Sequence, residues 1–503
     1  MSDAPARPVV AFRVGARIEP WQRRAGEALA AIGLAPSAWI GRPAGAAAAD
    51  AAHLVDETAP GLDRRLVELG VELVIDLSLS PPPLDWPVRE IWQPRFGHTA
   101  RCAPPVGEEL ERGERGLLLR LVRIEEPLVG TVLEEGTVKL VGYDLERSRT
   151  RILETLARWP ARVLAERRAS GIRRDLGRIA LAREVAREPA RLGSWRLRAT
   201  VRRLAECALD EHWRLGVAEV EAGEILAGFD ARRIRWLSEH EGLWLADPVA
   251  AADGWVFAEA FDLRARRGFL VRTRLEPEAP VETVLALPHH LSWPFLVEYG
   301  GARYLLPEAA ADGRLRLFRA DPFPHRWVPD RVLIEDFAGV DPVLFRHAGR
   351  WWLFAGDRRD QDETRLYLFF AEDLFGPWRP HPMSPVKDDL RSARSAGPVF
   401  AHAGRLYRPA QDCSRTYGGA VVINRIERLD PEVFREVAVA RLEPDPHGPC
   451  PHGLHTLLVL PGRIVVDGKR HRWSLRAFVA NLRASWREAR ASVRTAQPER
   501  SSA

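Results

Sequence analysis

The sequence predicts a multidomain chain that begins with an α/β domain of the half-Rossmann type and ends in a five-bladed β-propeller. The propeller is predicted because nearly the same pattern recurs five times, beginning at residues 246, 292, 340, 396 and 454. This spacing of about 50 residues is typical of a blade of four short antiparallel strands. Apolar residues alternate within each copy instead of following the helical period, which argues against a helical solenoid. A chain of 503 residues is also too long for a single core.

The α/β domain is assigned to residues 1–150. A short apolar strand at 9–12 is followed by a helix at 19–32, and a second helix at 62–69 leads into a branched apolar strand at 71–77. This alternation is typical of a parallel sheet covered by helices. The turn after the first strand lacks the glycine spacing of a dinucleotide-binding loop, so we expect no dinucleotide there.

Residues 151–210 are assigned to an arginine-rich helical linker. Between residues 151 and 205 the chain has 15 arginines and 5 acidic residues. We expect a solvated basic face; the alternative is a surface that binds an anionic membrane or a phosphate-bearing carrier. No interleaving of aromatic residues with the arginines suggests stacking on bases, so we expect no nucleic-acid partner.

The propeller is assigned to residues 211–474, and a C-terminal helix and tail to 475–503. The segment at 212–218 precedes the first repeat and is predicted to be the strand that closes the ring. The four cysteines have no paired spacing, which argues against a disulfide framework or a zinc site. We see no secretion signal and no apolar run of the roughly 18 residues that a membrane span needs, so we expect a cytoplasmic protein.

Polar residues recur where the innermost strand of each blade begins. Because these strands line the central channel of a propeller, we expect the residues to converge on one space. They are Asp247, Trp293, Asp341, Gly397 and His455, and the second strands end at Glu259, Glu308, Asp357, Gln411 with Asp412, and Asp467. Carboxylates repel one another, so their gathering indicates a polyol ligand, a bound cation or proton transfer. The alternative for any one aspartate is the capping of a turn.

Several motifs lie in the second half of the chain: His290-Leu-Ser-Trp-Pro294, Pro307-Glu308, Phe323-Pro-His-Arg-Trp327, Val340-Asp-Pro342, Arg350-Trp-Trp-Leu-Phe354, Gly376-Pro-Trp378, Arg408-Pro-Ala-Gln-Asp412 and His455-Thr456. With these motifs, the segment from about 210 to 470 resembles the propeller domain of plant glucosamine inositolphosphorylceramide transferases and their bacterial relatives. The resemblance implies a carbohydrate or glycolipid ligand. The plant proteins owe their transferase activity to a further glycosyltransferase domain, which we do not expect in this chain.

The first domain is similar to formyltransferases in Glu72-Leu-Val-Ile-Asp76 and the helix before it. That family carries an asparagine, a histidine within a His-Pro-Ser-Leu-Leu-Pro type of segment, and a downstream aspartate. The corresponding region here reads Gln93-Pro-Arg-Phe-Gly-His98 and lacks the asparagine and the Ser-Leu-Leu-Pro. Formyl transfer is therefore a disfavoured alternative, and we expect a structural role or another ligand for this domain.

The propeller also resembles five-bladed glycosidases of the arabinanase, xylosidase and levansucrase kind, which place a carboxylate at the entrance of each of the first three blades. By blade, this resemblance implies Asp247 as a base and Asp341 or Glu308 as a proton donor. Trp293 replaces the second carboxylate and would present an apolar face to a sugar ring. His455 would help to hold a channel cation such as calcium. The other candidate ligand-binding residues are Glu259, His290, Gln411 and Asp412.

Three functions remain open at this stage. The first is a carbohydrate-active enzyme of surface glycan or glycolipid metabolism, which hydrolyses or transfers a glycosyl group in the channel. The second is a non-catalytic glycan-binding module that uses the same residues. The third is a scaffold recruited through the arginine-rich helices. The substitution Asp247→Asn distinguishes them, since it would abolish turnover, abolish only binding, or do neither.

Overall fold

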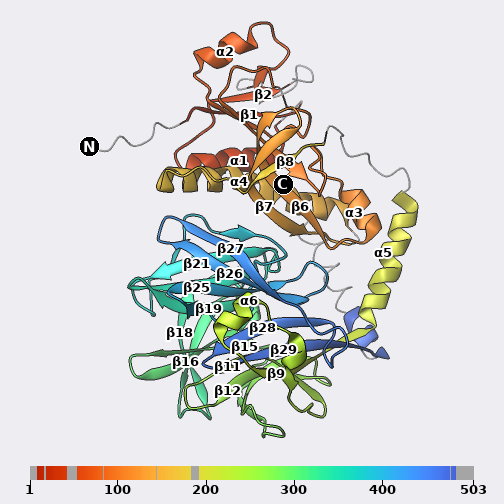
Figure 1. Cartoon of the computed structure of the whole chain (residues 1–503), viewed down its shortest axis with the longest axis vertical. Helices are drawn as coiled ribbons and strands as arrows, with labels where there is room; N and C mark the ends of the chain where they lie inside the picture. The colour runs from red at the N-terminus through yellow and green to blue at the C-terminus, as the bar shows by residue number, and fades with distance from the viewer. Residues whose placement is uncertain are drawn as a thin grey trace, which may run out of the picture.

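The computed structural model of the chain consists of an N-terminal α/β unit and a C-terminal five-bladed β-propeller (Figure 1). The structure describes residues 8–15, 18–41, 54–82, 84–142, 144–182, 192–475 and 477–482. The predicted fold class is therefore confirmed. Residues 183–191 of the predicted linker and 483–503 of the predicted tail lie outside the described residues.

The α/β unit is built on one sheet with the strand order β3-β2-β1-β4-β5-β6-β7-β8. The strands up to β5 pair in parallel, and β6, β7 and β8 continue the sheet antiparallel. The strands are β1 (Val10–Arg13), β2 (Ala38–Gly41), β3 (Leu54–Asp56), β4 (Leu73–Asp76), β5 (Glu90–Phe96), β6 (Gly116–Glu126), β7 (Val129–Lys139) and β8 (Arg178–Ala180), and the helices are α1 (Pro20–Ala31), α2 (Leu62–Glu68), α3 (Val106–Arg112) and α4 (Leu145–Ser170). All residues of β1 and β4 are buried, as expected for central parallel strands with helices on both faces. The order β3-β2-β1 is that of one half of a Rossmann sheet, and β4 and β5 continue the parallel sheet beside β1.

The first four blades follow one another along the chain, and each contains a four-stranded antiparallel meander. Blade 1 has β11 (Leu243–Ala250), β12 (Val256–Asp262), β13 (Arg267–Thr273) and β14 (Glu282–Leu285); blade 2 has β15 (Ser292–Tyr299), β16 (Ala302–Glu308), β17 (Leu315–Ala320) and β18 (Trp327–Ile334). Blade 3 has β19 (Gly339–His347), β20 (Arg350–Asp357), β21 (Arg365–Ala371) and β22 (Arg379–Pro380), with β23 (Lys387–Asp388) as a further partner of β21; blade 4 has β24 (Phe400–His402), β25 (Arg405–Asp412), β26 (Ala420–Leu429) and β27 (Phe434–Leu442).

The fifth blade joins the two ends of the propeller sequence. Its sheet has the order β10-β9-β29-β28, formed by β9 (Leu209–Glu219), β10 (Arg235–Trp236), β28 (Gly453–Leu460) and β29 (Arg463–Trp473). The short helix α6 (Ala222–Ala227) lies between β9 and β10 in the chain. β9 pairs with β29 over its whole length, from Leu209 opposite Trp473 to Glu219 opposite Arg463. The strand predicted to close the ring is therefore confirmed.

The arginine-rich segment is not a uniform solvated face. On α4, Arg162 is buried and donates to Asp388 Oδ2 of the propeller at 2.8 Å, and Trp159 Nε1 donates to the same oxygen at 3.2 Å. The expected basic face is corrected for this helix, because the guanidinium binds a buried carboxylate of the same chain instead of solvent or an anionic membrane.

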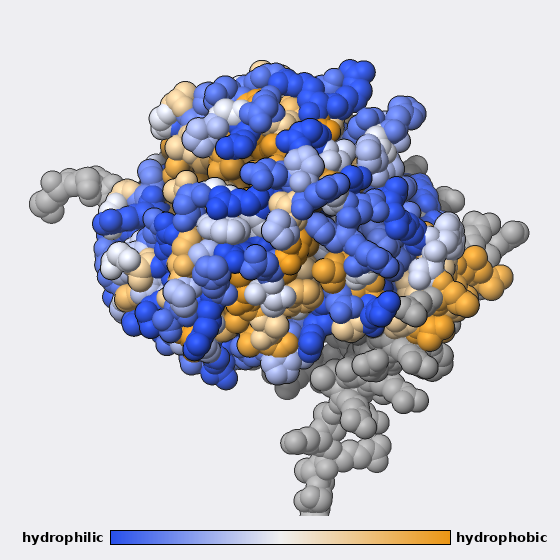
Figure 2. Space-filling view, turned by 90° about the horizontal axis from the view of Figure 1, so that it is seen from below, coloured by the Kyte–Doolittle hydropathy of each residue, from blue (hydrophilic) through white to orange (hydrophobic). Residues whose placement is uncertain are grey.

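The next helix, α5 (Leu192–Cys207), differs from α4. It exposes Leu197, Val201 and Leu204 and runs along the right-hand side of the molecule in Figure 1. Seen from below, the surface is mostly hydrophilic, with a group of hydrophobic residues at its right-hand edge (Figure 2). Among the described residues, none of the helices is both long and apolar enough to cross a membrane. Binding of an anionic membrane stays a prediction.

Candidate functional site

A cavity of about 330 Å³ lies at the mouth of the propeller channel, and every blade or its connecting loops contributes to it. Blade 5 provides Glu211, Trp213 and His455; blade 1 provides Trp244, Ala246, Asp247, Glu259 and Phe261; the segment leading into blade 2 and blade 2 itself provide His290, Ser292 and Glu308; blade 3 provides Asp341, Arg358, Asp362 and Glu363; and the loops of blade 4 provide Arg394 and Tyr417. Of the residues that the repeat pattern selected, the structure brings together Asp247, Glu259, Glu308, Asp341 and His455 in this cavity.

The backbone at the entrance of each of the first three blades is left-handed. Asp247, Trp293 and Asp341 have φ angles of 53°, 50° and 45°, a region that non-glycine residues seldom adopt. Each lies at a break in the register between the first and second strands of its blade, as in a β-bulge. Such strain costs roughly 1–3 kcal/mol per residue and is found at functional sites. The bulges re-aim the side chains at blade entrances.

In blade 4 the corresponding residue is Gly397. A Cβ atom built on it would lie 2.0 Å from the backbone oxygen of Leu457 in blade 5. The position therefore serves the close approach of two blades, and no side chain can enter the channel from it.

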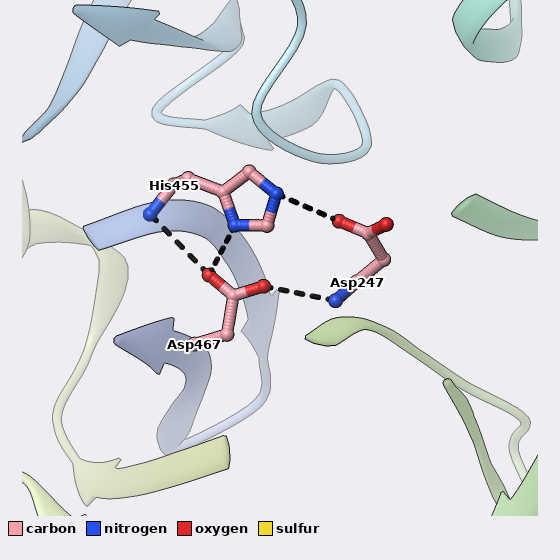
Figure 3. Close-up of side chains that lie close together, drawn as sticks. All are labelled: Asp247, His455 and Asp467. Atoms are coloured by element: carbon pink, nitrogen blue, oxygen red, sulfur yellow. Dashed lines mark hydrogen bonds and ion pairs between the residues drawn. The ribbon is translucent and has the colours of Figure 1, made fainter. Parts of the chain in front are cut away.

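His455 lies between two carboxylates (Figure 3). Its Nδ1 is 2.7 Å from Asp467 Oδ1, and its Nε2 is 3.1 Å from Asp247 Oδ1. Burial works against the charge, but the two carboxylates outweigh it and raise the pKa of His455 to about 10. The ring is therefore an imidazolium at neutral pH, and it ties blade 5 to blade 1.

The same three residues are the described group whose geometry comes nearest to a cation site. Asp467 Oδ1 receives the ring Nδ1 and the backbone amides of His455 and Thr456, at 2.7, 3.3 and 2.9 Å, and Oδ2 receives the amide of Asp247 at 2.9 Å. A carboxylate has about four lone-pair positions, so Asp467 has none left for a metal. Calcium needs six to eight oxygen ligands. These hydrogen bonds leave the group poorly suited to calcium, and His455 as a metal ligand stays a prediction beside its role in this hydrogen-bonded triad.

Glu259 is the buried acid best placed to hold a proton. Burial, together with the neighbouring carboxylates of Asp247 and Glu308, raises the pKa of Glu259 well above its ordinary value. His290 accepts the amide of Gly268 at Nδ1 (2.9 Å), which leaves its Nε2–H facing Glu259 Oε1 at 3.5 Å, too far for a strong hydrogen bond. Among the described residues, Glu259 Oε1 receives no hydrogen bond. Glu259 can instead share its proton with Asp247.

The other carboxyl pair, Asp341 and Glu308, is neutralised by arginines. Arg394 Nε lies 2.6 Å from Asp341 Oδ2, and Gln411 donates to the same oxygen at 3.1 Å. Arg358 Nη2 lies 2.6 Å from Glu308 Oε1. Burial opposes the charge on Glu308, yet Arg358 and Arg394 hold its pKa below the ordinary value. Burial raises the pKa of Asp341, against the effect of Arg394. The pKa of Asp341 thus lies well above its ordinary value, as that of Glu259 does, but its carboxyl group is also bound by Arg394.

Three of the predicted ligand-binding residues do not line this cavity. The indole of Trp293 is buried in the core and donates from Nε1 to the backbone oxygen of Pro342 at 2.8 Å, so it cannot stack on a sugar there. Gln411 donates a hydrogen bond to Asp341 instead of lining the cavity. Asp412 pairs with Arg441 instead. The left-handed backbone does not account for the first difference, because Asp247 and Asp341 share it and line the cavity; the indole instead has its acceptor in the backbone oxygen of Pro342.

The aromatic wall of the cavity was not predicted as such. Trp213 packs against the ring of His455 at a centroid distance of 4.1 Å, and Tyr417 lies 5.6 Å from the same ring. Trp244 and Phe261 complete the wall. Trp213 lies in the strand that was predicted to close the ring. This location was the one feature of the sequence that could have indicated its place in the cavity wall.

The N-terminal unit also reaches the cavity wall. Glu363 lines the cavity, and its carboxylate is bound by Lys139 of β7 and by Arg115, whose Nη2 is 3.3 Å from Glu363 Oε2. Burial opposes the charge, but these two cations hold the pKa of Glu363 below its ordinary value. One wall of the site thus depends on both parts of the chain.

Fold and site together define a five-bladed β-propeller protein with a carboxylate-rich, aromatic-walled cavity at the channel mouth. Residues 279–447 match the family described as glucosamine inositolphosphorylceramide transferase 1, N-terminal. The resemblance predicted from the sequence is confirmed over this segment, which contains Glu308, Asp341 and Arg394, whereas Asp247, Glu259 and His455 lie outside it. The formyltransferase-like character of the first domain stays a prediction.

Two relatives from plants illustrate the match. Glucosamine inositolphosphorylceramide transferase 1 of Oryza sativa subsp. japonica is 39% identical over 155 residues, which are 30% of this chain and 21% of the relative. The Arabidopsis thaliana protein of the same name is 34% identical over 165 residues, which are 32% of this chain and 21% of the relative. The chain thus aligns with about a fifth of the length of these relatives.

Among solved structures, a family 117 glycoside hydrolase from Zobellia galactanivorans is 13% identical with a TM-score of 0.32, and the alignment covers 52% of this chain and 92% of that one. An exo-beta-1,3-galactanase from Clostridium thermocellum is 10% identical with a TM-score of 0.33, with 42% and 57% covered.

Proposed function

We propose that the protein binds the sugar headgroup of a glycan or glycolipid in the channel-mouth cavity. The observation that carries this proposal is Glu259 Oε1, a buried oxygen that receives no hydrogen bond from the described residues and belongs to a residue that lines the cavity. Buried polar atoms are normally satisfied, so this oxygen can accept a hydrogen bond from a ligand. Sugar hydroxyls supply such donors.

The remaining walls suit the same class of ligand. Arg358 and His290 offer donors to hydroxyl oxygens, and the rings of Trp213 and Tyr417 offer apolar faces, a combination that small-molecule sites use for orientation and contact area. The names of the plant relatives specify glucosamine and inositolphosphorylceramide, which supports a carbohydrate or glycolipid ligand.

Glycosyl hydrolysis or transfer is the second candidate, favoured by the proton on Glu259. The two carboxyls that flank a glycosidic bond lie about 5–5.5 Å or 6.5–9.5 Å apart, depending on the stereochemistry. Glu259 and Asp247 are within hydrogen-bonding reach of each other and are too close for that arrangement. If the site is catalytic, Glu259 would therefore be the acid, and the pair Asp341 and Glu308 would supply the carboxylate on the other side of the glycosidic bond.

The experiment is calorimetric titration with glucosamine, N-acetylglucosamine and inositol phosphate, combined with release of nitrophenol from nitrophenyl glycosides. Glu259→Gln keeps a donor and an acceptor, so binding is expected to persist while any hydrolysis is lost. Glu259→Leu is expected to weaken binding about tenfold or more, because a buried hydrogen-bonding group contributes ~1–3 kcal/mol. Glu335→Leu, an exposed change outside the cavity, is the control.

The pH dependence gives a further check. If the ligand accepts the proton of Glu259 as a hydrogen bond, affinity falls as pH rises through the raised pKa of this group, and the fall is absent in Glu259→Gln. Equal affinities of the wild type, Glu259→Leu and Glu335→Leu for every sugar would overturn the proposal.

A further inference from the structure

A second cavity of about 290 Å³ adjoins the channel-mouth cavity, between blade 5 and blade 1. Two residues, Trp213 and Trp244, line both cavities. The segment 237–243, which leads from β10 into β11, forms one side, and residues of the β13–β14 connection form another. The two spaces are therefore neighbours that meet at these tryptophans.

An aromatic platform marks the boundary. The rings of Trp244 and Phe261 stack with an interplanar angle of 6° and a centroid distance of 4.7 Å. Trp244 is only half-buried, although a tryptophan at a blade interface is usually enclosed by its neighbours. A flat, partly open aromatic surface between two polar spaces is a place where a ring can lie.

The polar groups of the second cavity are held in place. Arg470 Nη2 and Arg472 Nη2 lie 2.8 and 2.9 Å from the two oxygens of Glu239, and Arg214 lies within 3.8 Å of the same carboxylate. Because three guanidiniums share one carboxylate, some of their N–H groups remain free to donate. The cavity thus offers fixed donors beside an aromatic face, as the first one does.

We propose that the ligand of the channel-mouth cavity extends across Trp244 into this second cavity, so that the protein recognises a glycoside of at least two rings. Each cavity alone is at the lower end of the ~300–1,000 Å³ that ligand sites occupy, whereas the two together hold a disaccharide or a sugar with a bulky aglycone. This inference rests on the proposed sugar-binding function and names the size of its ligand.

The test compares glucosamine with its β-1,4-linked disaccharide and tetrasaccharide as probes, by calorimetric titration of the full chain. The wild type is expected to bind the disaccharide about tenfold more tightly than the monosaccharide. Ala279→Trp fills the second cavity, which Ala279 lines, and is expected to remove that gain while monosaccharide affinity stays unchanged. Ala311→Trp, an exposed change on blade 2, is the matched control, and Ser238→Phe is a second filling variant in case Ala279→Trp fails to fold.

The outcomes separate the two proposals. Monosaccharide binding without any gain for the longer sugars would overturn the two-ring inference and leave the proposed function standing. A gain that persists in both filling variants would also overturn it. Absence of binding for all three sugars would contradict both.

Discussion

Lys139, the last residue of strand β7 in the N-terminal sheet, binds the carboxylate of Glu363 in the wall of the propeller cavity. The pair joins two parts of the chain that lie 224 residues apart in the sequence. Arg115 adds a second cation to the same carboxylate. The N-terminal unit is thus a positioning element for one wall of the site, in addition to any ligand of its own.

This relationship predicts a remote effect on binding. Lys139→Met is expected to weaken sugar binding several-fold, because Glu363 loses a cation, its pKa rises, and its carboxylate is no longer fixed. The measurement is the dissociation constant at pH 7 for the sugar that the wild type binds. Arg65→Met, which changes an exposed arginine paired with the exposed Glu68 of the N-terminal unit, is the control, and an effect of equal size there would refute the role of Lys139.

The triad around His455 predicts a pH-dependent stability. The pKa of His455 is raised to about 10 in the folded chain, against ~6.5 for an unfolded histidine. Its contribution is therefore complete below pH 6.5 and is lost as pH rises from 6.5 towards 10. His455→Gln is expected to lower the free energy of unfolding by ~3 kcal/mol at pH 6, since it leaves two buried carboxylates without their cation.

The check is denaturant unfolding of both proteins at pH 6 and pH 10. The difference between wild type and variant should shrink at the higher pH. The exposed His447→Gln should show no difference at either pH. A constant difference at both pH values would mean that His455 is not charged in the folded chain.

Trp293 predicts a separation of stability from binding. Because its indole donates to Pro342 and faces the core, Trp293→Phe is expected to cost about 1–3 kcal/mol of stability through the unpaired carbonyl and the lost volume. Sugar affinity should remain that of the wild type. Trp213→Phe changes a ring in the cavity wall and should affect affinity; the opposite pattern in the two titrations would restore Trp293 as a sugar-stacking residue.

Ring closure predicts the effect of shortening the chain. A chain that ends at Leu442 lacks β28 and β29, so β9 loses its partner and β11 loses its neighbouring blade. We expect it to be insoluble or to unfold without a cooperative transition, whereas a chain that ends at Leu482 should unfold like the full one. A soluble Leu442 chain with one sharp transition in circular dichroism would contradict the closed ring.

The blade positions were predictable because a repeat of strands and polar residues is local information. Asp247, Glu259, Glu308, Asp341 and His455 meet in the cavity because symmetry-related positions of a propeller converge. The orientation of Trp293 was not predictable, since it depends on a hydrogen bond to the backbone oxygen of Pro342 in the next blade, which the residue pattern does not show. Arg394 and Tyr417 lie in loops outside the repeat, and their places depend on contacts between blades.

The burial of α4 was missed for a related reason. From the sequence alone, its arginines indicate a solvated face. The partner of Arg162 is Asp388, which lies 226 residues further along the chain. A single sequence does not show a pairing over that distance, because neither residue has a distinctive local pattern.

The pairing of β9 with β29 also sets an order of events on the ribosome. β9 is synthesised before the first blade, and β29 after the fourth, so at ~5–20 residues per second roughly 10–50 s separate the appearance of the two partners. During that interval the edge of β9 that pairs with β29 is unpaired, and unpaired strand edges can pair with other chains. Nascent chains stalled between the two strands should therefore be the species that most needs a chaperone.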